Sequence, residues 1–245
     1  MSRPLKKAGF AQGLYEISST KRERLGTKRI LQDGRIFRYA YAGGALVAGK
    51  LVQMKAINAH HENVAPSAAA SAAATSIVMD TLSTTLSAGQ LIDGYVVVQD
   101  DAGEGYIYDV TDHEATTTPT IKIEPGLQEA LTTSSTLTLC HNPWWSCDHG
   151  TTEELLAVGV PLVDVTANYY CWLQTGGLCP VLINGSIAAG QAVAASAASS
   201  IEGAVGPAAP AVSTSVAAVT IPIVGYAIYA VNDTEYCPIY LTIDR

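Results

Sequence analysis

The residues best suited to binding a metal ion lie between positions 140 and 149. Cys140-His141 and Cys147-x-His149 bring four thiol and imidazole groups into one short stretch. Structural zinc sites usually separate two such ligand pairs by about a dozen residues or more. The close spacing favours free thiols in a packed loop over a zinc site. We therefore expect the protein to need no metal and no other cofactor.

Two further polar clusters contain residue types that bind metal ions, but their spacing in the sequence does not match that of known metal sites. His60-His61-Glu62 lies in a segment predicted to be extended, where adjacent side chains point to opposite sides. Asp100, Asp101 and Glu104 fall in a predicted hairpin loop and follow no recognisable calcium-loop pattern. We expect the adjacent histidines to share no ion, and we interpret the three acids as solvated turn residues.

Catalytic signatures are absent from the sequence. It contains no G-x-S-x-G, no phosphate-binding P-loop, no dinucleotide fingerprint after a strand and no HExxH. The five histidines, at positions 60, 61, 113, 141 and 149, all lie in predicted loops or strand ends. A Cys–His nucleophile pair is compatible with the composition, but nothing singles one out. We predict a protein that is not an enzyme.

The composition indicates a protein that packs against other proteins. Charged residues make up only 15% of the chain, against about 25% in ordinary globular domains. Phe occurs twice, whereas Tyr occurs 12 times and Trp three times. Amphipathic aromatic residues favour interfaces, and a surface poor in charge is unusual for a free monomer. These features predict self-association.

Export and membrane insertion are not predicted. No apolar region follows the basic N-terminal residues, and no run of 18 apolar residues occurs. The five cysteines are an odd number without a tandem CxxC motif. We expect synthesis in a reducing cytosol with free thiols, and no membrane partner.

The charges are divided between a basic head and an acidic body. Residues 1–55 hold 12 Lys and Arg against three Asp and Glu, a net charge of +9. The remainder holds two bases against 19 acids, a net charge of −17. This division favours docking of the head on an acidic protein surface. A nucleic-acid partner is not predicted, because aromatic and basic residues alternate only in Phe37-Arg38-Tyr39 and the body is acidic.

Residues 1–30 are predicted to form an extended arm that becomes ordered on a partner. They lack a sustained hydrophobic periodicity of 2 or 3.6 residues, but apolar residues that could contact a partner occur at intervals along them. A disordered basic tail is the alternative. Because no core strand is expected before residue 25, deletion of residues 2–24 should leave the body folded. The predicted partner-binding residues are Arg3, Leu5, Lys6, Lys7, Phe10, Leu14, Tyr15, Arg22, Arg24, Lys28 and Arg29.

The rest of the chain is predicted to consist of strands joined by tight turns. Alternating apolar residues and turn residues such as Asn-Gly and Asp-Gly carry this prediction. The elements expected are a hairpin over Ile30–Tyr41, a compact β-unit over Ser76–Asn142, strands at Val158–Val165, Tyr169–Gln174 and Cys179–Ile183 with a turn at Asn184-Gly185, and a last hairpin of Ile221–Ala230 with Tyr236–Ile243 that returns to the sheet holding Tyr169–Gln174.

A short cadence of small residues around a glycine occurs three times. It lies in Ala42–Val52, Leu86–Ile92 and Ile187–Val193. Each glycine is predicted to serve a tight turn or bulge before the next strand. Three copies this short fit recurring β-units but do not prove a repeat.

Two stretches give the chain a family resemblance. Gly177-Leu178-Cys179-Pro180-Val181-Leu182-Ile183-Asn184-Gly185, followed by Val224-Gly225-Tyr226-Ala227, resembles a cadence of tailed-bacteriophage capsid decoration (cement) proteins, a family of virion structural proteins. The likeness covers roughly residues 25–55 and 155–245. It implies a β-domain that binds the assembled major capsid protein on the capsid exterior of the virion, often as a homotrimer, after synthesis in the host bacterial cytoplasm.

We therefore predict a mostly-β fold: a small β-barrel or β-tulip-like domain with an inserted β-rich unit and an extended N-terminal arm. The expected organisation is an arm (1–30), the first part of the β-domain plus an Ala/Ser linker (31–75), an inserted β-unit (76–149) and the main β-domain (150–245). The predicted function is capsid decoration without enzymatic activity. Alternatives are another virion component, such as a head-fibre base or tail protein, or a cytosolic β-domain binding protein.

Overall fold

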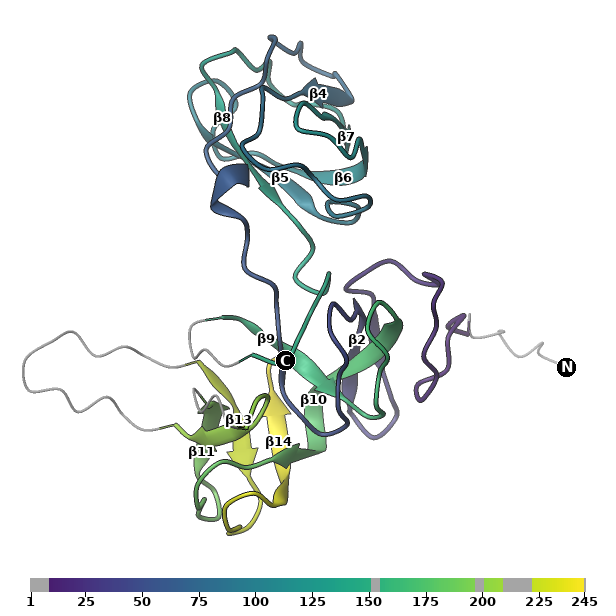
Figure 1. The fold of residues 1–245 in the computed structure, drawn as a ribbon, viewed down its shortest axis with the longest axis vertical. Helices are drawn as coiled ribbons and strands as arrows, with labels where there is room; N and C mark the ends of the chain where they lie inside the picture. Colours follow the sequence, from purple (N-terminus) through teal and green to yellow (C-terminus); the bar gives the residue numbers. More distant parts are fainter. Residues whose placement is uncertain (1–8, 151–154, 197–200, 209–221, 245) are drawn as a thin grey trace, which may run out of the picture. The chain divides into compact units, whose positions relative to one another are not determined.

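The computed structural model describes residues 9–150, 155–196, 201–208 and 222–244 (Figure 1). In this part of the chain there are fourteen strands and one 3-10 turn. The prediction of a mostly-β protein is confirmed. The expected barrel is not found, because neither of the two antiparallel sheets closes on itself within the described residues.

The chain divides into two units. Unit 1 comprises residues 1–55 and 146–245, and unit 2 comprises residues 56–145. An insertion is therefore present, but it begins some twenty residues before the predicted position 76. The Ala-rich stretch expected to be a linker belongs to unit 2, because Ala70 exchanges backbone hydrogen bonds with Leu131 and the Ala73 N–H donates to the Leu127 carbonyl. Pairing of backbone groups outweighs a linker-like composition here.

Unit 1 contains a nine-stranded antiparallel sheet. Its main order is β1-β2-β10-β14-β13-β11-β12, with β9 pairing to β10 and to β3. The predicted first hairpin is confirmed as β1–β2, and the last as β13–β14, which joins the sheet through β10. The strands are β1 (Lys28–Ile30), β2 (Ile36–Tyr41), β3 (Val52–Gln53), β9 (Ala157–Pro161), β10 (Tyr170–Leu182), β11 (Ala192–Ala195), β12 (Val205–Pro207), β13 (Ile223–Ala227) and β14 (Tyr236–Thr242).

Unit 2 contains a five-stranded antiparallel sheet in the order β4-β7-β6-β5-β8. Its apolar side chains form a separate buried cluster that includes Met79, Leu91 and Leu139. The predicted hairpin around the acidic loop is confirmed as β5–β6. The elements are η1 (Ala59–His61), β4 (Ser76–Val78), β5 (Tyr95–Asp100), β6 (Ile107–His113), β7 (Thr120–Glu124) and β8 (Thr136–Cys140).

The long strand β10 replaces two predicted strands. The turn expected between them is a β-bulge, where the register to β2 shifts between Gln174 and Gly176. The buried Gln174 amide donates to the carbonyls of Gly176 and Leu178 and so satisfies backbone groups at the bulge. The Asn184-Gly185 hairpin is also wrong, because β11 pairs with β12 and β13 and not with β10.

One β-motif occurs three times in the described chain. In each copy, two residues from different segments form a pair in which each N–H donates to the carbonyl of the other. A further backbone hydrogen bond lies beside this pair. The residue three positions after the pair's first residue donates its N–H to the carbonyl of the residue four positions before the pair's second residue. The donor residue has a positive φ in all three copies. The reciprocal pairs are Leu46–Val165, Ile187–Val231 and Ala70–Leu131, and the donors are Gly49, Gly190 and Ala73.

The two copies in unit 1 correspond strand for strand. Repeat A consists of residues 36–53 and 157–174, and repeat B of residues 177–194 and 223–240. The pairs Phe37–Gln174, Pro161–Leu173 and Val52–Gly159 of repeat A match Leu178–Tyr240, Ala227–Ile239 and Val193–Gly225 of repeat B. Even the register shifts after Val52 and Val193 coincide. Unit 1 is thus an internal duplication, and β10 belongs to both halves.

Candidate interaction surfaces

The residues considered for metal binding are divided between the two units. Cys140 and His141 belong to unit 2, whereas Cys147 and His149 belong to unit 1. Among the described residues there is no group of three or more His, Cys, Asp or Glu side chains that could hold a metal ion. All five cysteines are free, and burial raises the pKa of Cys171 and of Cys179 to about 12. Thiols with so high a pKa are poor nucleophiles.

His149 holds the turn of repeat A in place. The Val47 N–H donates to His149 Nε2 at 2.8 Å, so that nitrogen accepts and Nδ1 carries the proton, which faces the Leu51 carbonyl at 3.0 Å. Burial lowers the pKa of His149, the Leu51 carbonyl opposing the shift. The imidazole is therefore neutral at pH 7 and has a structural role.

The other two polar clusters also have structural partners. His60 and His61 lie in the 3-10 turn η1, so the expectation of an extended segment is wrong. His61 is buried, its Nε2 lies 3.2 Å from the Thr84 carbonyl, and burial lowers its pKa. In the acidic loop, the Thr132 hydroxyl donates to Asp101 at 2.7 Å.

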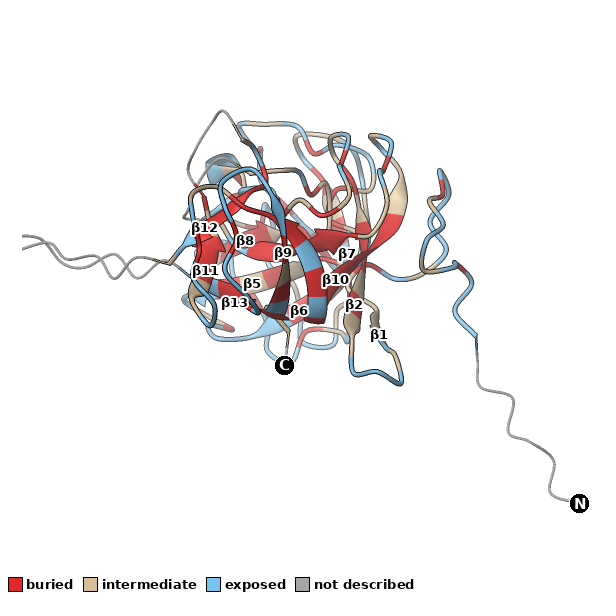
Figure 2. Ribbon diagram, turned by 90° about the horizontal axis from the view of Figure 1, so that it is seen from below, coloured by how far each residue is buried: buried red, intermediate tan, exposed pale blue. Residues whose placement is uncertain are grey.

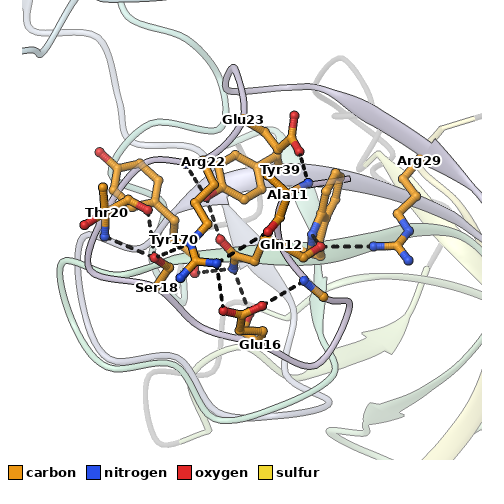
Figure 3. Close-up of polar contacts among 12 residues, drawn as sticks. Ala11, Gln12, Glu16, Ser18, Thr20, Arg22, Glu23, Arg29, Tyr39 and Tyr170 are labelled. Atoms are coloured by element: carbon orange, nitrogen blue, oxygen red, sulfur yellow. Dashed lines mark hydrogen bonds and ion pairs between the residues drawn. The ribbon is translucent and has the colours of Figure 1, made fainter. Parts of the chain in front are cut away.

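Residues 9–27 form an N-terminal segment that lies on repeat A (Figure 3). Gln12 is fully buried at its centre. Its Oε1 accepts from the Tyr39 hydroxyl at 2.7 Å, and its Nε2 donates to the carbonyls of Glu16 and Tyr170. The Trp172 Nε1–H donates to the Gln12 carbonyl at 3.2 Å. The segment thus satisfies buried polar groups of its own chain.

Aromatic and basic side chains also take part in the contact between the N-terminal segment and repeat A. The Phe10 ring meets Trp172 edge-on, with ring centroids 5.1 Å apart. The Arg29 guanidinium lies 4.9 Å from the Phe10 centroid and 5.6 Å from that of Trp172, within the range of cation–π attraction. Arg22 forms an ion pair with Glu16 at 3.1 Å.

The predicted partner-binding residues therefore divide into three groups. Phe10, Arg22, Lys28 and Arg29 contact their own chain, Lys28 through Asp244 at 3.3 Å. Leu14 is half-buried, and Tyr15 and Arg24 are exposed but also have partners in their own chain, Tyr15 beside Arg35 and Arg24 through Thr27. Arg3, Leu5, Lys6 and Lys7 lie outside the described residues. From residue 9 onward the segment is ordered on its own body, because complementary aromatic and hydrogen-bonding groups are present there.

An exposed apolar surface lies on repeat B. We call it the tyrosine face and define it as Leu178, Ile223, Tyr226, Tyr236 and Tyr240. Cross-strand pairing places Leu178 beside Tyr240 and Tyr240 beside Tyr226, in one row over β10, β14 and β13. The five side chains are 40–54% exposed and none is charged. The intervening residues of these strands are largely buried, as the alternating colours of β10 show (Figure 2).

A shallow groove accompanies this repeat. It has a volume of about 410 Å³ and lies between two loops, with Ser186, Ile187, Ala188 and Gln191 on one side and Ala230, Val231 and Asn232 on the other. No lining residue is charged. Sequence reasoning predicted the strands of the tyrosine face but not which side stays open. Tyr236 and Tyr240 alternate with Cys237 and Ile239, a pattern that indicates two faces of the strand but not which of them is open.

Comparison with known proteins gave no relative. No family model, no curated protein and no solved structure matches this chain. In the described residues, no helix is long and apolar enough to span a membrane.

Proposed function

We propose that this protein is a non-enzymatic phage virion structural protein of the capsid decoration type. It would bind the outside of the major capsid lattice and stabilise it. The observation that carries the proposal is the tyrosine face, an uncharged sheet surface built from large apolar side chains. Surfaces of this kind mark protein–protein contacts, and the homotrimer included in the proposal requires such a contact between copies. The resemblance of residues 25–55 and 155–245 to decoration proteins supports the same assignment.

The stabilising mechanism is additive. A decoration protein binds only the assembled shell, so each bound copy shifts the equilibrium away from disassembly. Each contact can be modest, because many copies act on one particle. The proposal includes a homotrimer on the capsid exterior of the virion and synthesis in the host bacterial cytoplasm. It involves neither nucleic acid nor a membrane as partner.

The N-terminal segment is part of the proposed capsid contact. Tyr15 and Arg24 of this segment are exposed, and the basic residues of positions 1–8 precede them in the sequence. Positive charge at this end favours docking on an acidic capsid surface and makes the binding sensitive to salt.

The test is binding to assembled shells of the major capsid protein that this chain is proposed to decorate. Purified protein should sediment with expanded empty shells, and a cryo-EM map should place it on the outer surface. Tyr240→Arg should reduce the bound fraction, whereas Tyr106→Arg, at an exposed tyrosine of unit 2, should not. Failure of the wild-type protein to sediment with the shells, or density only inside them, would contradict the proposal.

A further inference from the structure

We infer that the tyrosine face is the surface on which a second copy of this chain packs. The inference deepens the proposed function by naming the self-association surface. It rests on the self-association included in that function and not on capsid binding. Three observations lead to it: the equivalent surface of repeat A is buried, part of it is buried by repeat B, and the exposed side chains of the tyrosine face are uncharged.

The same surface is buried in repeat A. The duplication relates Leu178, Tyr240, Tyr226 and Ile223 of repeat B to Phe37, Gln174, Val160 and Ala157 of repeat A. The four residues of repeat A are at most 7% exposed, whereas those of repeat B are 40–54% exposed. Within the described residues, the two copies of one motif therefore differ in whether this surface is covered.

The partner of repeat A is another repeat. Ala157 and Val160 belong to one hydrophobic cluster with Val181, Val224 and Ile239 of repeat B. The part of this surface formed by Ala157 and Val160 thus packs against the neighbouring repeat. In repeat B the equivalent positions have no such neighbour among the described residues. A repeat supplied by a second chain is the occupant that the internal contact already exemplifies.

The N-terminal segment completes the cover on repeat A. Phe10 and Gln12 contact Trp172, and Gln12 also binds Tyr39. The equivalents of Tyr39 and Trp172 in repeat B are Pro180 and Pro238, which carry no side-chain donor. The tyrosine face therefore needs no polar cap of this kind, and a partner with an apolar surface satisfies it.

The side chains of the tyrosine face suit contact between identical copies. No Asp, Glu, Lys or Arg belongs to it, so two copies can meet there without burying an unpaired charge. Tyrosine combines a large apolar ring with a hydroxyl that can stay solvated, which is why it is enriched at interfaces that also exist in open form. The whole chain carries a net charge of −8, which opposes association, so an uncharged face is where copies can approach.

Site-specific photocrosslinking of the full chain tests the inference. One variant carries p-benzoyl-phenylalanine in place of Tyr240, and a control carries it in place of Tyr106 on unit 2, where the native ring is similarly exposed. Both replace one aromatic side chain by another, so folding is preserved and is verified by circular dichroism. The proteins are irradiated in solution without capsids at up to about 100 µM, and crosslinked peptides are identified by mass spectrometry.

The position 240 variant should give covalent oligomers whose crosslinks map to unit 1 of another copy, and Tyr226→Arg in the same chain should reduce their yield at least tenfold. The control should give none of these crosslinks. No oligomer from position 240, or crosslinks only to unit 2, overturns the inference. Capsid binding without these crosslinks would support the decoration function and overturn the assignment of the tyrosine face to self-association. Crosslinks without capsid binding would support self-association through the tyrosine face and overturn the decoration function.

Discussion

Replacing Gln12 by alanine should destabilise unit 1, although Gln12 lies in a segment predicted to become ordered on a partner. The side chain makes three hydrogen bonds in a fully buried position, to Tyr39, Glu16 and Tyr170. Burial raises the pKa of Tyr39 to about 12, so its hydroxyl keeps the proton that it donates to Gln12.

The magnitude follows from the partners that remain. A buried hydrogen bond contributes about 1 kcal/mol net, and an orphaned buried polar group costs about 1–3 kcal/mol. The Tyr39 oxygen still accepts from the Arg22 N–H at 3.1 Å, but its proton loses the Gln12 acceptor. We expect Gln12→Ala to lower the free energy of unfolding by about 2–4 kcal/mol.

The assay is urea denaturation followed by the fluorescence of Trp172, the sole tryptophan of unit 1. Tyr15→Ala is the matched control, because Tyr15 lies in the same segment but is 64% exposed. Combining Gln12→Ala with Tyr39→Phe measures their coupling, which should be about 1 kcal/mol or more. A Gln12 variant as stable as the control, with strictly additive effects in the double variant, would refute the reasoning. That result would instead agree with the prediction that deletion of residues 2–24 leaves the body folded.

Three further predictions follow from the turns and from the insertion. The pKa of His149 is lowered in the folded protein, so as the pH falls the unfolded chain binds a proton at this histidine before the folded chain does, and unit 1 should lose stability below about pH 6.5. In thermal melts, His149→Gln should weaken the dependence of the melting temperature on pH, and an unchanged dependence would contradict this prediction. Gly49→Ala should lower the free energy of unfolding by about 2–3 kcal/mol, because the new Cβ would lie 2.6 Å from the Tyr236 ring at a residue with φ +74°. Gly190→Ala should lower it by only about 1 kcal/mol, because no atom lies within 4 Å of its Cβ, and equal melting temperatures of the two variants would count against this account. Excision of residues 56–145 with a short Gly-Ser bridge should leave unit 1 folded, because the flanking residues already pair across the gap; loss of its near-ultraviolet dichroism would show the opposite.

Local patterns predicted the hairpins well. The pairs β1–β2, β5–β6 and β13–β14 each join neighbouring segments through turn residues, so alternation and turn chemistry determine them. The glycines at positions 49, 89 and 190 all have positive φ, as their cadence predicts. These features depend on a few consecutive residues, which is why sequence alone contains them.

Features that depend on distant residues were missed. Gly176-Gly177 has the composition of a turn, but pairing with β2 and β14 on either side keeps the chain extended through a bulge. The copy of the motif in unit 2 uses Ala73 where the other two use glycine, so its corner has no glycine to mark it. An Ala-rich stretch that pairs through an isolated bridge, as Ala70 does with Leu131, is recognisable only from its partner.

The same limit applies to the interaction surfaces. Phe10 and Arg29 have the side chains of a partner-binding arm, and composition cannot say that their partner is Trp172 of the same chain. Likewise, the alternation of β14 predicts two faces without saying which one is open. The duplication supplies that answer, because it compares one surface in two settings: Val160 is covered by a neighbouring repeat, whereas its equivalent Tyr226 is 40% exposed. Because the two copies share a backbone and differ in burial, the comparison of these copies is what leads us to propose a second chain as the partner of the exposed one.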